Sequence, residues 1–147
     1  MYCDDKYICR SVLYRSVLYR YVLANGDAPF RDAFKSRRCL VPADGLYEWK
    51  PLGAKTKQPY RFIMRDGSPM AFAGMWERWR DPANGETVKS FTIITGEPNA
   101  LCAPIHNRMP VILDPADFPA WRGETPAAPE QLQALLDRSR PSAWRRT

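Results

Sequence analysis

The alternation of apolar and polar positions predicts a strand, a turn and a second strand between residues 39 and 50. The turn signal is the Pro-Ala-Asp-Gly sequence at residues 42–45. In the second strand, successive side chains point to opposite faces of the sheet. One face carries Leu46, Glu48 and Lys50, and the opposite face carries Tyr47 and Trp49.

Other short apolar runs predict further strands in the middle of the chain. Residues 60–64 and 70–75 flank the turn signal Asp-Gly-Ser-Pro at residues 66–69, and we expect them to form a hairpin. The β-branched and apolar runs at residues 91–95 and 111–113 are typical of buried strands.

Helices are predicted nearer the ends of the chain. Residues 29–34 suit a short helix with a proline in its first turn and with Phe30 and Phe34 facing inward. The other expected segments are one or two helical turns at 98–103, helices at 115–121 and 129–138, and a basic tail at 139–147 that frays from Pro141 on. Strands dominate the middle, helices flank it, and no strand–helix–strand alternation appears. The sequence therefore predicts an α+β domain.

Residues 1–28 differ in character from the rest of the chain. The sequence Ser-Val-Leu-Tyr-Arg at residues 11–15 is repeated at once at residues 16–20. A five-residue tandem copy is too short for a solenoid repeat, and its period does not decide between a strand and a helix. We therefore interpret residues 1–28 as an atypical N-terminal segment of a single domain that covers residues 1–147.

Charge and cysteine spacing narrow the class of protein. The formal net charge of +6 and the pI of about 9.3 suit a polyanionic partner such as nucleic acid, although many basic proteins are merely soluble. The four cysteines lack C-x-x-C spacing and there is one histidine, so no metal and no other cofactor is expected. No apolar run reaches the ~18 residues of a membrane span, and no signal peptide pattern opens the chain. We expect a cytoplasmic protein with reduced thiols and no membrane partner.

Two side chains are candidates for acid–base chemistry. His106 is the one histidine in the chain, and histidine is the side chain type whose unperturbed pKa, about 6.5, lies near physiological pH. Arg108, two residues further on, is a fixed cation suited to an anionic substrate. The alternative for His106 is a half-buried ring satisfied by a backbone carbonyl. Glu48 lies among aromatic residues and needs a partner or a task if it is partly buried. The alternative for Glu48 is a surface ion pair with Lys50.

Aromatic and cationic residues are interleaved at residues 75–80, which include Trp76 and Arg78. Such a mixture suits stacking on bases and neutralising phosphates. The alternative is a core tryptophan beside a solvated charged face.

Three longer sequence words follow one another: RRCLVPADGLYEWK at residues 37–50, PYRFIMRDGSPMAFAGMWERW at 59–79, and FTIITGEPNALCAPIHNRMPVIL at 91–113. Together they resemble the SRAP family, the SOS response-associated peptidases or abasic-site processing proteins, over residues 29–122. The resemblance implies a compact fold around a mixed, barrel-like sheet flanked by short helices. It also implies a positively charged channel for single-stranded DNA.

The resemblance implies a covalent reaction with abasic sites, prepared by autoproteolytic removal of leading residues. In the family, the nucleophile is a cysteine directly after the initiator methionine. Its α-amine attacks the ring-opened aldehyde of the sugar to form a Schiff base, and its thiol closes a thiazolidine. An N-terminal cysteine is suited to this because its amine, of pKa about 8, and its thiol reach the same carbon.

The resemblance also implies roles for single residues. Glu48 matches an acid–base glutamate, and His106 matches a histidine beside the sugar oxygen. Arg108 and Thr95 match residues near DNA phosphates, while Asn99 lies in a matching loop. The candidate set is Cys3, Glu48 and His106 for catalysis, and Arg20, Arg37, Arg38, Trp76, Arg78, Thr95 and Arg108 for DNA binding.

The N-terminus departs from the family pattern. The chain begins Met-Tyr-Cys-Asp in place of Met-Cys-Gly-Arg, and the bulky Tyr2 opposes the methionine removal that would help to expose Cys3. The family's Asn-Ala-Arg-x-Glu word is not found, and Arg20 lies at a suitable distance to replace its arginine. We therefore expect an N-terminally truncated or degenerate member. Missing strands would expose a sheet edge and favour self-association.

Two alternatives to crosslinking stay open. One is an inactive, non-enzymatic module that binds single-stranded DNA through Arg37, Arg38, Arg78 and Arg108. The other is a peptidase acting on other proteins, which rests only on Cys3 or Cys39 with His106 and is ranked last. We interpret Cys39 and Cys102 as small buried apolar residues.

Overall fold

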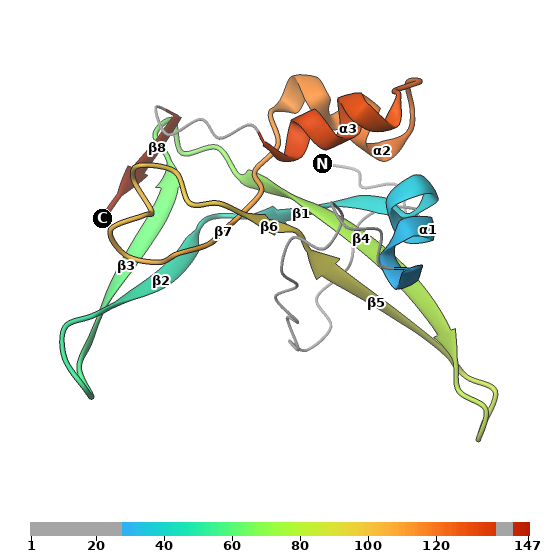
Figure 1. Cartoon of the computed structure of the whole chain (residues 1–147), viewed down its shortest axis with the longest axis horizontal. Helices are drawn as coiled ribbons and strands as arrows, with labels where there is room; N and C mark the ends of the chain where they lie inside the picture. The colour runs from blue at the N-terminus through green and yellow to red at the C-terminus, as the bar shows by residue number, and fades with distance from the viewer. Residues whose placement is uncertain (1–27, 138–142) are drawn as a thin grey trace.

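The computed structural model describes residues 28–137 and 143–147 of the chain (Figure 1). Helix α1 (Ala28–Ser36) comes first and confirms the predicted helix. Its Phe30 and Phe34 pack against the hydrophobic core, as their spacing of one helical turn predicts.

The first sheet contains β1 (Arg38–Ala43), β4 (Met70–Arg80) and β5 (Thr87–Ile93), in the order β1-β4-β5. Both strand pairs are antiparallel, and β4 lies in the centre. The two faces of β4 contribute to two separate cores. Ala73 and Met75 belong to a cluster with residues of the helices, whereas Phe72 belongs to a cluster with the second sheet.

The second sheet contains β2 (Leu46–Pro51), β3 (Lys57–Met64) and β8 (Trp144–Arg146), in the order β2-β3-β8. Its strand pairs are also antiparallel. Phe62 and Trp144 of this sheet are buried in one cluster with Phe72 of β4. The two sheets therefore share a hydrophobic core.

Two short strands, β6 (Thr95–Gly96) and β7 (Met109–Pro110), pair with each other and join the ends of the segment 97–108. Backbone hydrogen bonds attach this unit to β4. The N–H of Val111 donates to the carbonyl of Ile94 at 2.9 Å, and the carbonyl of Val111 accepts from Ala73 at 2.8 Å. The segment that contains His106 is thus held against the central strand.

The helices predicted after this unit are present. A 3-10 helix η2 (Pro115–Asp117) leads into α2 (Phe118–Arg122), and α3 (Pro129–Leu136) follows. Figure 1 shows α2 and α3 together at one side of the molecule. Trp121 of α2 and three leucines of α3 are buried in the core that α1 also contacts.

The predicted hairpin between residues 60 and 75 is wrong. The turn exists, with the Asp66 carboxylate accepting hydrogen bonds from the N–H and hydroxyl of Ser68. However, β3 pairs with β2 and β8, while β4 pairs with β1 and β5. The turn signal is the same whether the chain folds back on itself or passes to another sheet, so long-range pairing decides the outcome.

The chain also changes sheets between β1 and β2, at Gly45. This glycine has φ +156°, and a Cβ atom there would lie 2.7 Å from the carbonyl oxygen of Phe62. Only a residue without a side chain fits this close approach of two backbones.

The expectation that the tail frays is wrong for residues 143–147. Trp144 is 2% exposed, and β8 adds to the edge of β3. The backbones of Thr147 and Arg61 exchange two hydrogen bonds, at 2.9 and 3.0 Å. Burial of one large indole supplies enough apolar contact to order this terminus.

The α+β class is confirmed, and two details of the expectation differ. All strand pairs among the described residues are antiparallel, and these strands form three sheets, not a closed barrel. At residues 111–113, Val111 and Leu113 are buried as predicted, but Ile112 makes only an isolated bridge with Phe72. No helix in the described ranges is long and apolar enough to cross a membrane.

Candidate functional site

Glu48 lies on β2, on the same face as Leu46 and Lys50, as the sequence predicts. Leu46, Glu48 and Lys50 are half-buried, whereas Tyr47 and Trp49 are 57% and 50% exposed. Leu46 packs against the core between the two sheets, so the same face of β2 turns Glu48 toward that core. Within residues 28–137 and 143–147, Glu48 makes no ion pair with Lys50, so the surface-pair alternative is not what the structure has.

Hydrogen-bonded turns place His106. The Asn99 side-chain oxygen accepts from the N–H groups of Leu101 and Cys102, both at 3.0 Å, which starts the turns. The N–H of His106 then donates to the carbonyl of Cys102 at 3.0 Å. This confirms the helical turns predicted after residue 98 and fixes the backbone on which His106 is mounted.

The imidazole of His106 is held on one side by the backbone of Arg108. Its Nδ1 lies 2.9 Å from the Arg108 carbonyl oxygen and 3.2 Å from the Arg108 nitrogen. The carbonyl contact needs a proton on Nδ1, because a carbonyl oxygen only accepts, whereas the Arg108 N–H can donate to Nδ1 only when that proton is absent. The backbone carbonyl of the alternative interpretation is therefore present, but it contacts only one ring nitrogen. When Nδ1 carries the proton, Nε2 is the nitrogen that can accept another.

Glu48 and His106 lie close enough to affect each other's charge. Burial raises the pKa of Glu48, while the positive charge of His106 and the N–H of Trp49 act in the opposite direction. A carboxyl group that keeps its proton at higher pH can act as an acid as well as a base. The structure thus brings together two of the three residues predicted to be catalytic.

Cys102 is part of the same cluster. Burial, and then the negative charge of Glu48, raise the pKa of the Cys102 thiol to about 11. Its Sγ donates a weak hydrogen bond to the Arg108 carbonyl at 3.9 Å. As predicted, Cys102 and Cys39 are buried. A protonated thiol beside Glu48 is an apolar wall of the site, not a nucleophile.

We expect neither Cys39 nor Cys102 to react with a thiol reagent such as iodoacetamide in the folded protein at pH 8. Both sulfurs are buried, and the raised pKa keeps the Cys102 thiol protonated at that pH. Peptide mass mapping after labelling in buffer and in denaturant measures this. Labelling of Cys102 in buffer, at the rate seen in denaturant, would contradict the buried placement.

Arg108 is fixed by Thr95. Its Nε and Nη2 donate to the Thr95 hydroxyl at 3.0 and 2.6 Å, and Nη2 also donates to the Thr95 carbonyl at 2.8 Å. Thr95 is 1% exposed, whereas Arg108 is half-buried. No carboxylate in the described part of the chain forms an ion pair with Arg108. An oriented guanidinium without a carboxylate suits an anionic ligand such as phosphate.

The other predicted DNA-binding residues that the structure describes lie at the start of β1 and on β4. Arg37 forms a 2.7 Å ion pair with Glu77. Arg38 is buried and donates to the carbonyls of Phe34, Lys35 and Trp121, so it supports the end of α1. Trp76 is half-buried on β4 and Arg78 is exposed further along that strand. Cys3 and Arg20 lie outside the described residues.

One feature that the sequence interpretation left without a function is the exposed aromatic pair on β2. The rings of Tyr47 and Trp49 lie 6.4 Å apart between centroids, on the face opposite Glu48. The alternation of side chains along the strand was the sequence signal for this pair, because it places both rings on the face opposite Glu48. In the ranges that the structure describes, no group of His, Cys, Asp or Glu side chains is arranged to hold a metal ion.

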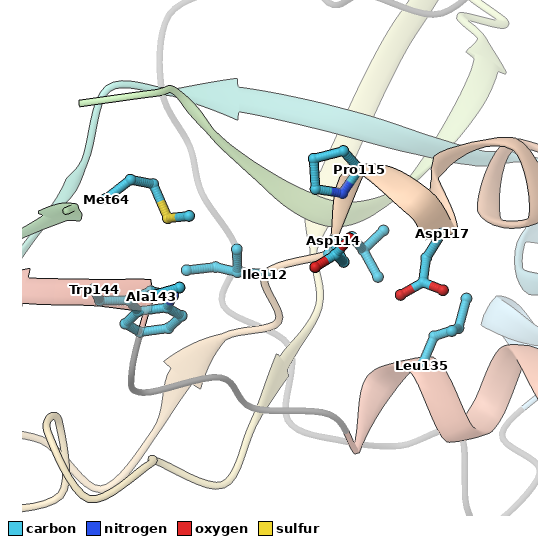
Figure 2. A pocket seen from close by; sticks show the side chains of 9 residues that line it. Met64, Ile112, Asp114, Pro115, Asp117, Leu135, Ala143 and Trp144 are labelled. Atoms are coloured by element: carbon cyan, nitrogen blue, oxygen red, sulfur yellow. The ribbon is translucent and has the colours of Figure 1, made fainter. Parts of the chain in front are cut away.

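A pocket elsewhere in the molecule is separate from this cluster (Figure 2). Apolar side chains, among them Met64, Ile112 and Trp144, line one part of it, and Leu135 of α3 lines another. Neither Glu48 nor His106 contributes to its wall, so the pocket is not the place of the acid–base pair.

Comparison with known proteins now identifies the family. The SOS response associated peptidase (SRAP) family matches residues 21–146, and the chain belongs to this family. It is 44% identical to the abasic site processing protein YoqW of Bacillus subtilis over 107 residues. This matched region covers 73% of this chain and 47% of YoqW. It is 38% identical over 98 residues to the abasic site processing protein HMCES of Xenopus tropicalis, over 55% of this chain and 29% of HMCES.

Solved structures agree with this assignment. A crystal structure of a protein from Bacteroides thetaiotaomicron superposes with a TM-score of 0.76 at 30% identity, covering 82% of this chain and 52% of that protein. The chain spans about half the length of the bacterial relative YoqW and less of HMCES.

Proposed function

We propose that the chain captures abasic sites in single-stranded DNA by forming a covalent bond with them. Glu48 and His106 exchange protons in this reaction, and Arg108, held by Thr95, binds a neighbouring phosphate. The placement of Glu48 beside His106 supports this most strongly, because a carboxyl of raised pKa next to an imidazole can transfer protons near neutral pH. The names of the relatives support the same substrate.

The nucleophile in this proposal is Cys3, once autoproteolysis has removed Met1 and Tyr2. Its α-amine adds to the aldehyde carbon of the ring-opened sugar, and loss of water gives a Schiff base. Glu48 in its protonated form gives a proton to the departing hydroxyl. The thiol then adds to the same carbon while its proton passes to the nitrogen, which closes the thiazolidine. His106 holds the sugar oxygen and returns protons through Nε2.

The test is incubation of the purified chain with single-stranded DNA carrying one abasic site, followed by boiling and a denaturing gel. We expect a shifted band that survives boiling, is absent with undamaged DNA, and is lost in Cys3→Ser. The intact mass of the protein reports whether Met1 and Tyr2 are removed. A chain that begins with Met-Cys-Gly-Arg is the reference. If that chain also gives no band, the proposed reaction is wrong.

The non-enzymatic alternative gives a different result in the same experiment. It predicts binding that weakens steeply with salt and no covalent band with either N-terminus.

A further inference from the structure

The hairpin formed by β4 and β5 extends well beyond the rest of the first sheet. We call residues 76–91, its outer part, the arm. Figure 1 shows the tip of the arm and the tip of the β2–β3 hairpin at opposite ends of the long axis of the molecule. The strands of the arm continue the antiparallel register of the sheet to the pair Arg80↔Thr87.

The register gives the arm two chemically different faces. Residues directly opposite each other in an antiparallel pair share a face, and neighbours along a strand alternate. One face contains Glu77, which forms the ion pair with Arg37, and also contains Trp79 and Val88. The opposite face, which we call the arm face, contains Trp76, Arg78, Arg80, Thr87, Lys89 and Phe91.

The arm face is cationic without local compensation. Arg78 and Lys89 are exposed and directly opposite each other. No strand position on the arm face is acidic. Among the described residues, neither turn carboxylate, Asp81 or Glu86, forms an ion pair with Arg78, Arg80 or Lys89. Like charges directly opposite each other destabilise a sheet. An anion bound between them removes that repulsion, which points to a ligand.

The arm face lies on the same side of the sheet as the candidate site. Along β4, alternation places Phe72 and Gly74 on the same face as Trp76 and Arg78. Phe72 belongs to the core cluster that contains Cys102, whose thiol lies beside Glu48. The other side of β4 is covered by the helices through Met75 and Ala73. A chain of phosphates that leaves the site can therefore continue onto the arm face.

The spacing of the cations favours a phosphodiester backbone over a single anion. The Arg80 Nε donates to the Gly85 carbonyl at 3.2 Å, so its two Nη groups remain for an anion. Arg78 and Arg80 are two residues apart on one strand, which separates their Cα atoms by about 7 Å. That is comparable to the distance between neighbouring phosphates of a nucleic-acid strand. Trp76 and Phe91, half-buried and opposite each other, lie between these cations and the core of the sheet. They give the face an aromatic base on which a nucleotide can pack.

We propose that Arg78, Arg80 and Lys89 form a second phosphate-binding site, which holds the DNA strand flanking the abasic nucleotide. The statement that an abasic nucleotide lies at the candidate site rests on the proposed function. Phosphate binding by the arm face does not, because it applies to undamaged strands as well. The site sets how much DNA the protein covers, and it takes no part in bond formation.

The experiment measures binding of an undamaged single strand of about 16 nucleotides to the full chain, by fluorescence anisotropy over a range of salt. The variants are Lys89→Ala and the double variant Arg78→Ala with Lys89→Ala. The matched control is Lys35→Ala, which removes another exposed lysine, from α1 on the helix-covered side of the sheet. Lys89→Arg keeps the charge.

We expect the slope of log affinity against log salt to become shallower by about 0.7 in Lys89→Ala and by about 1.4 in the double variant. The affinity of the double variant falls about tenfold at low salt. Lys35→Ala and Lys89→Arg keep the slope of the original chain. An unchanged slope in the double variant, or an equal change in Lys35→Ala, overturns the proposal. Thermal melting of each variant confirms that the fold is retained.

The covalent gel assay with abasic DNA separates this proposal from the proposed function. If no crosslink forms at all but the slopes differ as expected, the arm face stands and the proposed reaction fails.

Discussion

Glu48→Gln is expected to slow crosslinking to abasic DNA by about 100-fold. Glutamine keeps the size of the side chain and its hydrogen-bonding oxygen, but it cannot deliver or accept a proton. The half-buried position beside His106 and the raised pKa of Glu48 are what make the native carboxyl suited to that step. The measurement is the rate at which the boiling-resistant band appears. It is made with the original N-terminus or with the Met-Cys-Gly-Arg N-terminus, whichever gives the faster crosslinking.

Glu77→Gln is the control for this change. It neutralises the carboxylate of the arm that is paired with Arg37 and that lies on the face of β4 opposite the candidate site. We expect near-normal crosslinking in Glu77→Gln. We also expect Glu48→Gln to bind undamaged DNA reversibly, with an affinity no lower than that of the original chain. Equal crosslinking rates in the two variants would remove Glu48 from the proposed mechanism.

Trp121→Ala is expected to lower the free energy of unfolding by about 4 kcal/mol. The indole is 0% exposed, its Nε1 donates to the Cys39 carbonyl at 2.9 Å, and its ring meets Phe34 edge-on. Alanine would leave a cavity between α1, α2 and the first sheet, and a buried carbonyl without its donor. Urea unfolding followed by circular dichroism measures the change.

The matched tryptophan is Trp79 at the end of β4, which is 56% exposed. Trp79→Ala is expected to change the free energy of unfolding by no more than about 0.5 kcal/mol. A loss of several kcal/mol in Trp79→Ala, or a negligible loss in Trp121→Ala, would contradict the placement of Trp121 in the core and of Trp79 at the surface.

Local signals in the sequence predicted elements well and their partners poorly. The facing of Phe30 and Phe34 and the alternation around Glu48 depend on the period of one helix or strand, and both are confirmed. The hairpin at residues 60–75 failed because a turn signal does not reveal which sheet each strand joins. The prediction that the tail frays failed because Trp144 is buried by residues far away in the sequence, those of β3 and its neighbours.

The candidate site shows the same division. Residue type alone made His106 and Glu48 candidates, but no local pattern relates a strand residue to a loop residue so much later in the chain. Their proximity was implied by the family resemblance, and the structure provides it through the shared core of the two sheets. Cys102 as a wall of the site, and the role of Arg38 in supporting α1, depend on tertiary contacts that no spacing rule gives.

Gly45 couples the architecture of the protein to its chemistry. At this point the chain leaves the first sheet, and three residues later it presents Glu48 to His106. The direction in which the carboxyl is aimed is therefore set by a backbone corner that tolerates no methyl group. The position of the acid therefore depends on a glycine whose side chain is a single hydrogen atom, because a carbon atom there would meet the backbone of β3.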